Sequence, residues 1–395
     1  MTQHRSPHGR CALWILIGLA LGVVSCQPAP SLSEEGPTDV VAVLGAEPSP
    51  GFEPIMAVAE IEFPPDHGPH PAQQIEWWYT TINLRGERGQ RFGVEVTFFR
   101  IGLVPPAERI ERQSAWATDD LYMAHFAVTD AEANRFTAFE RFTRGGLQLA
   151  GATGDPWRVW NETWELRGTG GGERPFPLSL RADDRDRFGD VAIDLLLDSE
   201  FGAVRHGDHG FSRKGTEPGN ASRYYSYPSL NVSGTLQLGG RTHSVSGTGW
   251  FDHEWSTSVL GDSLEGWDWF SVQLDDGGRL MLFELRQETG EVSFGSGTWI
   301  APDGVATPLD REDFTIEVLD EWQSQKSGVI YPNRWRLNLQ KRKEVYELVP
   351  ILANQELRLS TRYWEGAVDV NDSKGKQIGW GYVELVGYGP RSTDQ

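Results

Sequence analysis

Apolar and polar residues alternate along most of the chain from Trp77 onward. Segments with this period of two predict β-strands that turn one face toward a core. Turn dipeptides such as Gly86-Glu87, Asp276-Gly277 and Asp303-Gly304 separate them, as is typical of hairpins. Helical periodicity is nearly absent, apart from a short segment near Pro106 to Ser114. The predicted strands are Arg91–Arg100, Tyr122–Thr129, Trp160–Leu166, Val191–Leu197, Leu230–Leu238, Ser246–Trp255, Trp267–Leu274, Arg279–Arg286, Phe314–Trp322, Arg334–Leu339, Tyr346–Pro350, Tyr363–Val370 and Gly379–Gly387.

Many antiparallel strands at regular spacing favour closed barrels, because closure removes exposed strand edges and can enclose one ligand. Roughly 335 residues follow the leader and linker described below, which suggests two domains. We therefore predict an all-β protein with two antiparallel β-barrel domains in tandem. The expected division is a signal peptide over 1–26, a disordered linker over 27–58, one barrel over 59–240 and a second over 241–395.

The chain begins with a leader that predicts export. Arg5 and Arg10 precede an apolar run from Ala12 to Val24, which is too short to span a bilayer comfortably. Small residues directly before Cys26 are typical of bacterial lipoproteins, in which that cysteine carries the lipid. Ordinary cleavage with a free Cys26 is the alternative. We expect a lipoprotein on the periplasmic side of the outer membrane, bound to the membrane through its N-terminal lipid anchor.

Composition narrows the classes of function. The formal charge is −20, and loss of the leader with Arg5 and Arg10 would bring it to about −22. Such a surface repels phosphate backbones, so we expect no nucleic-acid partner. Cys11 lies inside the leader, which leaves Cys26 as the one remaining cysteine and excludes a disulfide framework. Residues 27–58 are rich in Pro, Ser, Glu, Gly and Ala, as in a flexible tether.

Aromatic and titratable side chains are most concentrated in the segment Gly249-Trp250-Phe251-Asp252-His253-Glu254-Trp255. On a strand, Phe251, His253 and Trp255 share one face, and the other face carries Trp250, Asp252 and Glu254. A histidine beside an indole could move a proton while the ring faces a developing cation. A structural histidine bonded to a carboxylate is the alternative, and we expect Asp252 and Glu254 to be scaffolding.

Glu284 is a second candidate, because it lies in the apolar segment Leu280-Met281-Leu282-Phe283-Glu284-Leu285. Burial would raise the pKa of its carboxyl and keep a proton available near neutral pH. Pairing with Arg286 would weaken that hypothesis. Asp268, between Trp267 and Trp269, is expected to accept N–H bonds and to be structural.

Metal and nucleophile motifs are not apparent. His67 and His70, and likewise His206 and His209, lie beside Gly or Pro, which prevents a helix that would align them as ligands. The sequence also contains no Gly-x-Ser-x-Gly elbow, phosphate loop, dinucleotide fingerprint or His-Glu-x-x-His motif. We expect no bound metal and no cofactor.

A set of short motifs resembles the secreted branch of the carotenoid 1,2-hydratase (hydroxyneurosporene synthase) and AttH-like family, a branch described as predicted secreted hydrolases. The motifs occur in the same order as in that family and extend over about residues 58 to 390. It is carried by Asp66-His67-Gly68, Glu76-Trp77-Trp78-Tyr79, Thr97-Phe98-Phe99-Arg100, His125-Phe126, Ser212-Arg213-Lys214-Gly215, Trp250–Trp255, Gly266–Phe270, Tyr363-Trp364-Glu365-Gly366 and Gly381-Tyr382-Val383-Glu384.

This resemblance implies lipocalin-like barrels, an apolar cavity and cofactor-free addition of water to an isoprenoid double bond. By motif position, it implies that His253, Trp255 and Glu284 are catalytic. The hydratases carry an aromatic residue and an aspartate at the later strand, where this chain has Phe283-Glu284. The apolar, isoprenoid-like or lipid-like partner is expected to contact Trp77, Trp78, Tyr79, Phe251, Trp267, Trp269 and Phe283.

Two functions stay open at this point. The first is an exported hydro-lyase, or a related lyase or isomerase, that uses acid/base chemistry on such a molecule. The second is a non-catalytic carrier of hydrophobic ligands at the cell envelope, because barrels of this kind commonly bind ligands without reacting with them.

Overall fold

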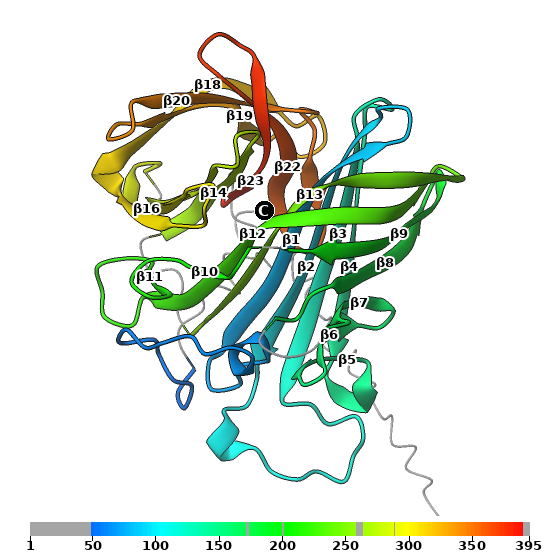
Figure 1. Cartoon of the computed structure of the whole chain (residues 1–395). Coiled ribbons are helices and arrows are strands. Elements are labelled where there is room, and N and C mark those ends of the chain that lie inside the picture. The colour runs from blue at the N-terminus through cyan, green and yellow to red at the C-terminus, as the bar shows by residue number, and fades with distance from the viewer. Residues whose placement is uncertain (1–48, 171–173, 200, 258–263, 288, 390–395) are drawn as a thin grey trace, which may run out of the picture. The chain divides into compact units, whose positions relative to one another are not determined.

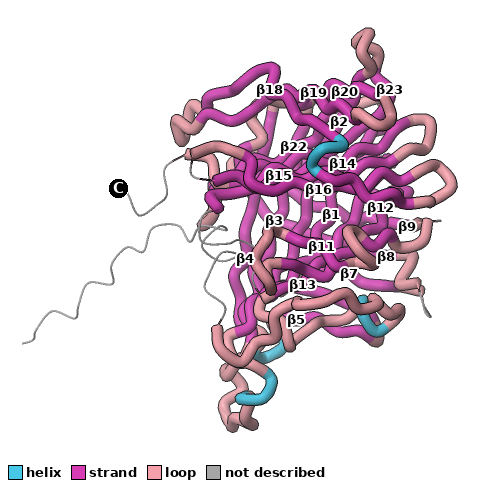
Figure 2. Tube along the Cα trace, turned by 90° about the vertical axis from the view of Figure 1, so that its left-hand side faces the viewer, coloured by secondary structure: helices cyan, strands magenta, loops and turns pink. Residues whose placement is uncertain are grey.

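The computed structural model describes residues 49–389, apart from 171–173, 200, 258–263 and 288. Strands make up most of this part of the chain, and the remainder is mainly loops and turns, as Figure 2 shows. The described helices are short 3-10 turns: η1 (Pro65–His67), η2 (Pro106–Glu108), η3 (Gly146–Gln148) and η4 (Arg311–Asp313). Among the described residues, no helix has the length and apolar character needed to cross a bilayer. The predicted all-β class is confirmed.

The first sheet is antiparallel throughout and follows the order β4-β3-β2-β1-β13-β12-β9-β8-β7-β6-β5, with β10 and β11 pairing β12 (Figure 1). Its strands are β1 (Ile75–Gly86), β2 (Arg91–Gly102), β3 (Asp120–Asp130), β4 (Arg135–Arg144), β5 (Ala150–Gly154), β6 (Trp157–Asn161), β7 (Trp164–Gly168), β8 (Leu178–Asp186), β9 (Gly189–Asp198), β10 (Val204–Arg205), β11 (Phe211–Arg213), β12 (Ala221–Leu238) and β13 (Arg241–Ser256).

The second sheet is also antiparallel and follows the order β17-β16-β15-β14-β23-β22-β20-β19-β18, with β21 pairing β22. Its strands curl round on themselves (Figure 1). They are β14 (Leu264–Leu274), β15 (Arg279–Gln287), β16 (Val292–Ile300), β17 (Ala306–Asp310), β18 (Phe314–Gln323), β19 (Ile330–Leu339), β20 (Glu344–Pro350), β21 (Glu356–Arg358), β22 (Arg362–Asn371) and β23 (Gln377–Val386).

The alternating pattern located most strands but not all of them. The strand predicted at Trp160–Leu166 is wrong as a single element, because Glu162 has a φ of 55° and the chain turns there between β6 and β7. The long strands β4, β8 and β16 were missed, and so were the short strands β5, β10, β11, β17 and β21. The helical segment predicted near Pro106 is limited to the single turn η2.

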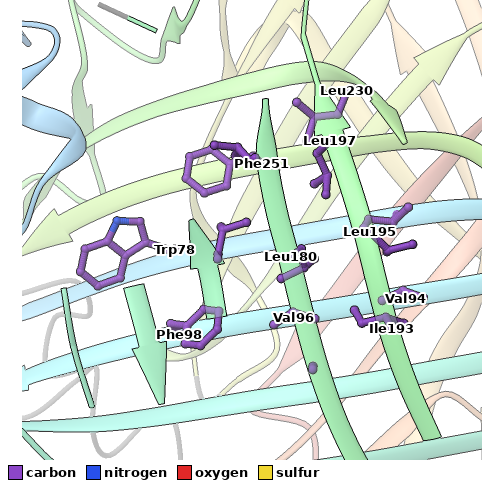
Figure 3. Close-up of a cluster of buried hydrophobic side chains, with 14 of the residues drawn as sticks. Trp78, Val94, Val96, Phe98, Leu180, Ile193, Leu195, Leu197, Leu230 and Phe251 are labelled. Atoms are coloured by element: carbon purple, nitrogen blue, oxygen red, sulfur yellow. The ribbon is translucent and has the colours of Figure 1, made fainter. Parts of the chain in front are cut away.

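The first sheet encloses an apolar core between its curled strands. Trp78, Phe98 and Phe251 lie in this core together with aliphatic side chains from β8 and β9, such as Leu180 and Leu195 (Figure 3). Strand β6 contacts β2, β3 and β4 across the core, so the sheet folds back on itself. A second core, around Trp335 and Trp364, fills the second sheet. These two curled sheets are the predicted lipocalin-like barrels in tandem.

A third core joins the outer faces of the two sheets. It contains Tyr79 and Trp250 from the first sheet and Trp269, Phe283 and Tyr382 from the second. Strands β1, β2 and β13 are therefore buried on both faces over much of their length. Both faces of β13 can consequently carry chemistry away from bulk water.

Strand β13 lies between β1 and β12 in the first sheet. The predicted boundary between residues 240 and 241 would divide the β12–β13 hairpin, whose strands pair from Leu238 and Arg241 onward. The change of sheet falls later, between Ser256 and Leu264.

At the N-terminal end of the described residues, residues 49–58 form no strand, but Phe52 and Ile55 are buried, so packing begins inside the predicted linker. The predicted signal peptide and Cys26 lie outside the described residues.

Candidate functional site

A pocket lies between the two sheets, where their outer faces meet. Its walls come from β1, β2, β12 and β13 of the first sheet, from β14, β15 and β23 of the second, and from Lys214, which follows β11. The pocket is narrow, with a cavity volume of about 70 Å³. The lining residues are Trp77, Tyr79, Thr97, Phe99, Lys214, Tyr224, Asp252, Glu254, Trp267, Trp269, Phe283, Leu285 and Glu384.

Strand alternation explains how polar groups reach this pocket. On β13, Asp252 and Glu254 point toward the second sheet, and Phe251 and Trp255 on the other face enter the core of the first. On β1, Trp77 and Tyr79 line the pocket and Trp78 lies in that core. Each strand thus supplies one face to a barrel and the other face to the pocket.

Asp252 is held in place by three donors. Its carboxylate accepts hydrogen bonds from Tyr224 Oη at 2.9 Å, from Trp250 Nε1 at 2.6 Å and from the hydroxyl of Ser226. Burial nevertheless raises the pKa of Asp252 to about 7, and the three hydrogen bonds oppose that shift. Asp252 can therefore exchange a proton near neutral pH.

Glu384, on β23, is the second carboxyl group in the pocket wall. Trp267 Nε1 donates to its Oε2 at 3.0 Å, and among the described residues no other hydrogen bond to this carboxyl is present. Loss of hydration raises the pKa of Glu384 to about 7, and the Trp267 hydrogen bond opposes the shift. The side chain is partly exposed, so this carboxyl can meet a ligand.

An ion pair marks another part of the pocket wall. Lys214 Nζ lies 2.7 Å from Glu254 Oε1, and Ser222 also donates to that carboxylate. The same ammonium lies 4.4 Å from the ring centroid of Phe283. A desolvated lysine between a carboxylate and an aromatic ring can orient a polar group on an otherwise apolar ligand.

More carboxyl groups lie behind the wall. Thr97 donates to Glu95 and Tyr79 donates to Glu365, and both Thr97 and Tyr79 line the pocket. Burial raises the pKa of Glu95 to about 8 and that of Glu365 well above its ordinary value. The interface between the sheets therefore contains several carboxyl groups that retain protons near neutral pH.

The structure brings His253 and Trp255 together on one face, as alternation predicts, with ring centroids 4.9 Å apart. That face is the barrel side of β13, away from the pocket. His253 Nε2 lies 2.8 Å from Glu76 Oε1, and Nδ1 lies 3.1 Å from Tyr225 Oη. Burial lowers the pKa of His253 to about 4, which keeps it neutral at pH 7.

Glu76 is the centre of a buried polar cluster in the first barrel. Its Oε1 also lies 2.8 Å from His70 Nδ1, and Arg100 Nε donates to its Oε2 at 2.9 Å. His70, Glu76 and His253 are a ligand set that could hold a metal ion by residue type. The three candidate ligand atoms, His70 Nδ1, Glu76 Oε1 and His253 Nε2, already hydrogen-bond among themselves. The Arg100 guanidinium already supplies a positive charge beside the Glu76 carboxylate, so the cluster is complete as a set of hydrogen bonds and an ion pair. Sequence reasoning did not foresee that His70 would meet Glu76.

Glu284 lies apart from both sites. It forms an ion pair with Arg311 at 3.2 Å, and Arg286 pairs instead with Asp268 at 3.0 Å. Burial raises the pKa of Glu284 to about 7, and Arg311 opposes the shift. The direction agrees with the sequence prediction, but the carboxyl does not line the pocket between the sheets.

The predicted ligand contacts divide in the same way. Trp77, Tyr79, Trp267, Trp269 and Phe283 line the pocket. Trp78 and Phe251 lie in the first barrel core (Figure 3).

Sequence reasoning passed over Asp252, Glu254, Lys214 and Glu384 as functional residues. A signal for all four was present, because they fall within the short motifs that carry the family resemblance. It could not be used, because alternation does not tell which face of a doubly buried strand meets a pocket.

Comparisons with known proteins agree with this architecture. A crystal structure of a Nitrosomonas europaea protein described as an AttH has a TM-score of 0.76 and 30% identity, and the match covers 86% of this chain and 100% of that chain. Kievitone hydratase from Nectria haematococca has a TM-score of 0.61 and 15% identity, covering 85% and 98%, a likeness that shows the fold alone. No curated protein sequence matches the chain. The AttH-like family pattern matches residues 54–388, and the chain belongs to the AttH-like family.

Proposed function

We propose that this protein is an exported acid/base enzyme, a hydratase or a related lyase or isomerase, that acts on an apolar, isoprenoid-like molecule in the pocket between the sheets. One observation carries the proposal. Asp252 and Glu384, two carboxyl groups whose pKa values lie near 7, face an aromatic-walled pocket from different sheets. Paired groups of this kind are what acid/base catalysis at neutral pH requires.

The two carboxyl groups have different surroundings, which suggests their roles. Glu384 accepts one hydrogen bond and is the better proton donor. Asp252 accepts three, which favour its ionised form, so it is the better proton acceptor. In a hydration, Glu384 would protonate an alkene carbon, and Asp252 would take a proton from the water that attacks the resulting cation.

The aromatic wall supports this chemistry. The faces of Trp77, Trp267 and Trp269 can stabilise a carbocation. Without such a wall, water could attack that cation from any side. The pair of Lys214 and Glu254 would orient a polar end of the substrate. No cofactor is needed for this sequence of steps. His253, Trp255 and Glu284 remain a rival assignment of the catalytic residues.

The test uses the purified protein, an apolar extract of the producing cells and water labelled with ¹⁸O. We expect labelled alcohol to form with the wild type. The Glu384→Gln variant should lose about 100-fold or more of that rate, because the general acid is removed while the shape is kept. Ligand retention, measured by native mass spectrometry, should be unchanged, and the exposed Glu317→Gln on β18 serves as control.

The same experiment separates the rival hypotheses. Recovery of an unmodified ligand without labelled product, from wild type and variants alike, would identify a carrier. Loss of turnover in a folded His253→Ala variant, together with full activity in Glu384→Gln, would overturn our assignment and support the catalytic role of His253.

A further inference from the structure

We propose that one end of the first sheet is a membrane-docking surface, whose exposed apolar side chains enter the interface of a zwitterionic phospholipid bilayer. The docking surface consists of Leu103, Ile110 and Trp116 in the loop between β2 and β3, Phe142 near the end of β4, and Leu147 and Leu149 in or beside η3. It shares no residue with the wall of the pocket between the sheets, so it is independent of the proposed chemistry.

The strand ends explain why these segments lie together. Gly102 at the end of β2 pairs with Asp120 at the start of β3, which also pairs with the end of β4 beside Arg144. The loop and η3 therefore leave the sheet at the same edge. A Cβ atom added at Gly146 would lie 3.1 Å from the carbonyl oxygen of Ala115, so η3 packs against the loop. Figure 1 shows the loop, in cyan, beyond the ends of these strands.

Exposed apolar side chains are concentrated at this edge. Among the described residues, thirteen large apolar side chains are exposed, and six of them belong to the docking surface. Ile110 is 70% exposed and Trp116 is 64% exposed. A group of apolar side chains exposed in one region is typical of a surface that meets a partner.

The backbone at η3 also holds an apolar side chain outward. Leu147 has a φ of 55° and Gln148 has a φ of 57°, which lie in the left-handed region that residues other than glycine rarely adopt. Leu147 is nevertheless exposed, so the unfavourable backbone is not offset by burial of its side chain. Backbone strain of this kind gathers at functional positions, which agrees with a partner at this edge.

The described chain begins at the same edge, and this identifies the partner. Ser49 N donates to Gln74 Oε1 at 2.9 Å, just before β1 begins. A Cβ atom added at Gly102 would lie 2.6 Å from Cε1 of Phe52, so that ring covers the end of β2. The predicted linker therefore reaches the first sheet beside residues 103–119.

The linker is short enough to orient the molecule. Gln27 to Pro48, 22 residues, separate this edge from Cys26, the expected site of the lipid. A flexible linker of that length would span about 26 Å on average and about 75 Å when fully extended. An anchor at Cys26 would thus hold the docking surface, and not the opposite end of the barrel, nearest to the bilayer.

The composition of the surface fits a zwitterionic bilayer. The indole of Trp116 suits the boundary between headgroups and acyl chains, where it can bury its ring and keep its N–H in a polar layer. Both arginines of the loop are already paired, Arg109 with Asp120 at 3.0 Å and Arg112 with Asp119. A protein with a formal charge of −20 is repelled by an anionic surface, so apolar insertion has to supply the binding.

Vesicles of equal parts phosphatidylethanolamine and phosphatidylcholine test this surface. The Cys26→Ser chain, which lacks the expected lipid, is mixed with vesicles at millimolar lipid, because such binding is weak and reversible on dilution. We expect binding that persists when NaCl is raised from about 0.1 M to about 0.5 M, since apolar insertion is not screened by salt. Ile110→Ser and Trp116→Ser together should weaken it about tenfold or more, because two inserted apolar side chains are lost.

Val305→Ser is the matched control, because Val305 is a comparably exposed apolar side chain between β16 and β17 of the second sheet. This variant should bind vesicles as before. A second measurement places the indole. Brominated phospholipid should quench the part of the fluorescence that Trp116→Phe removes, because bromine quenches only a ring that enters the bilayer.

Three results would overturn the proposal. They are no vesicle binding by the Cys26→Ser chain, equal binding by the variant with both substitutions, and a vesicle-free dimer that both substitutions abolish, since the surface would then join two copies. The fraction in which the wild type is found in cells depends on Cys26, whereas vesicle binding of the Cys26→Ser chain does not. Failure of the anchor and failure of the docking surface are therefore distinguishable.

Discussion

Asp252 and His253 are neighbours in the chain and face opposite sides of β13. Both side chains are buried, and burial favours the neutral form of each. It raises the pKa of the Asp252 carboxyl and lowers the pKa of the His253 imidazole. The histidine side is closed by Glu76 and Tyr225, and the aspartate side opens into the pocket. At the scale of single residues, access to a ligand therefore separates the two candidates more clearly than residue type does.

Glu95 predicts how stability depends on pH. Its folded pKa of about 8 lies above the ordinary value of 4.5, so between these pH values the folded state holds a proton that the unfolded state has lost. The free energy of unfolding contributed by this group is full below pH 4.5 and declines as pH rises toward 8. Glu95→Gln removes that decline, and we expect the variant to gain about 3 to 4 kcal/mol on the wild type between pH 5 and pH 8.

Urea denaturation at several pH values measures this gain. Glu87→Gln, an exposed substitution in the turn between β1 and β2, is the control and should show no such trend. A stability difference between Glu95→Gln and wild type that stays constant from pH 5 to pH 8 would contradict the prediction.

At the scale of elements, β2 comes close to the second sheet at Gly93. A Cβ atom added at Gly93 would lie 2.8 Å from Ala367 Cβ on β22 and 3.3 Å from Tyr382 Oη on β23. No larger residue fits without movement of one sheet against the other. Glycine at this position therefore brings the outer faces of two curled sheets into contact.

We expect Gly93→Ala to lower the free energy of unfolding by about 1 to 3 kcal/mol through overpacking. Ala367→Gly in the same chain should restore part of that loss, because it removes the opposing methyl group. Guanidinium denaturation of the two single variants and the double variant measures the coupling. Gly202→Ala is the control, since no atom lies within 4 Å of a Cβ there. Additive effects of Gly93→Ala and Ala367→Gly would show that the two positions do not press on each other.

The strand assignments show what local pattern can and cannot resolve. Period-two alternation located strands such as β2, β9 and β15 within a few residues. It merged β6 and β7, because a turn of Asn161-Glu162-Thr163 carries no Gly or Pro to mark it. It missed β4, whose side chains are mostly half-buried and do not alternate clearly between apolar and polar types.

At the scale of the whole molecule, the expected lipid anchor and linker would place an acidic, two-barrel protein close to a membrane surface. Cys26 and most of the linker lie outside the described residues, so the anchor remains a proposal. In cells that make the protein, we expect the wild type in the membrane fraction, released by detergent. Cys26→Ser should move it to the soluble fraction, because a cleaved chain without a lipidated cysteine has no anchor.

Cys11→Ser is the matched control, since Cys11 lies inside the predicted signal peptide and is removed with it. Fractionation followed by mass spectrometry of the N-terminal peptide distinguishes the outcomes. Equal distribution of wild type and Cys26→Ser between the fractions would contradict the anchor.

The all-β class, the two barrels and the family could be deduced from the residues, because alternation and short motifs are local properties that persist whatever the chain packs against. The pairing of His253 with Trp255 on one face followed for the same reason. The position of the pocket did not follow, because β1, β2 and β13 are buried on both faces, and period two cannot distinguish a barrel core from a sheet interface. Only tertiary contacts between residues more than a hundred positions apart, such as Trp267 and Glu384 or Tyr79 and Glu365, decided where the carboxyl groups meet.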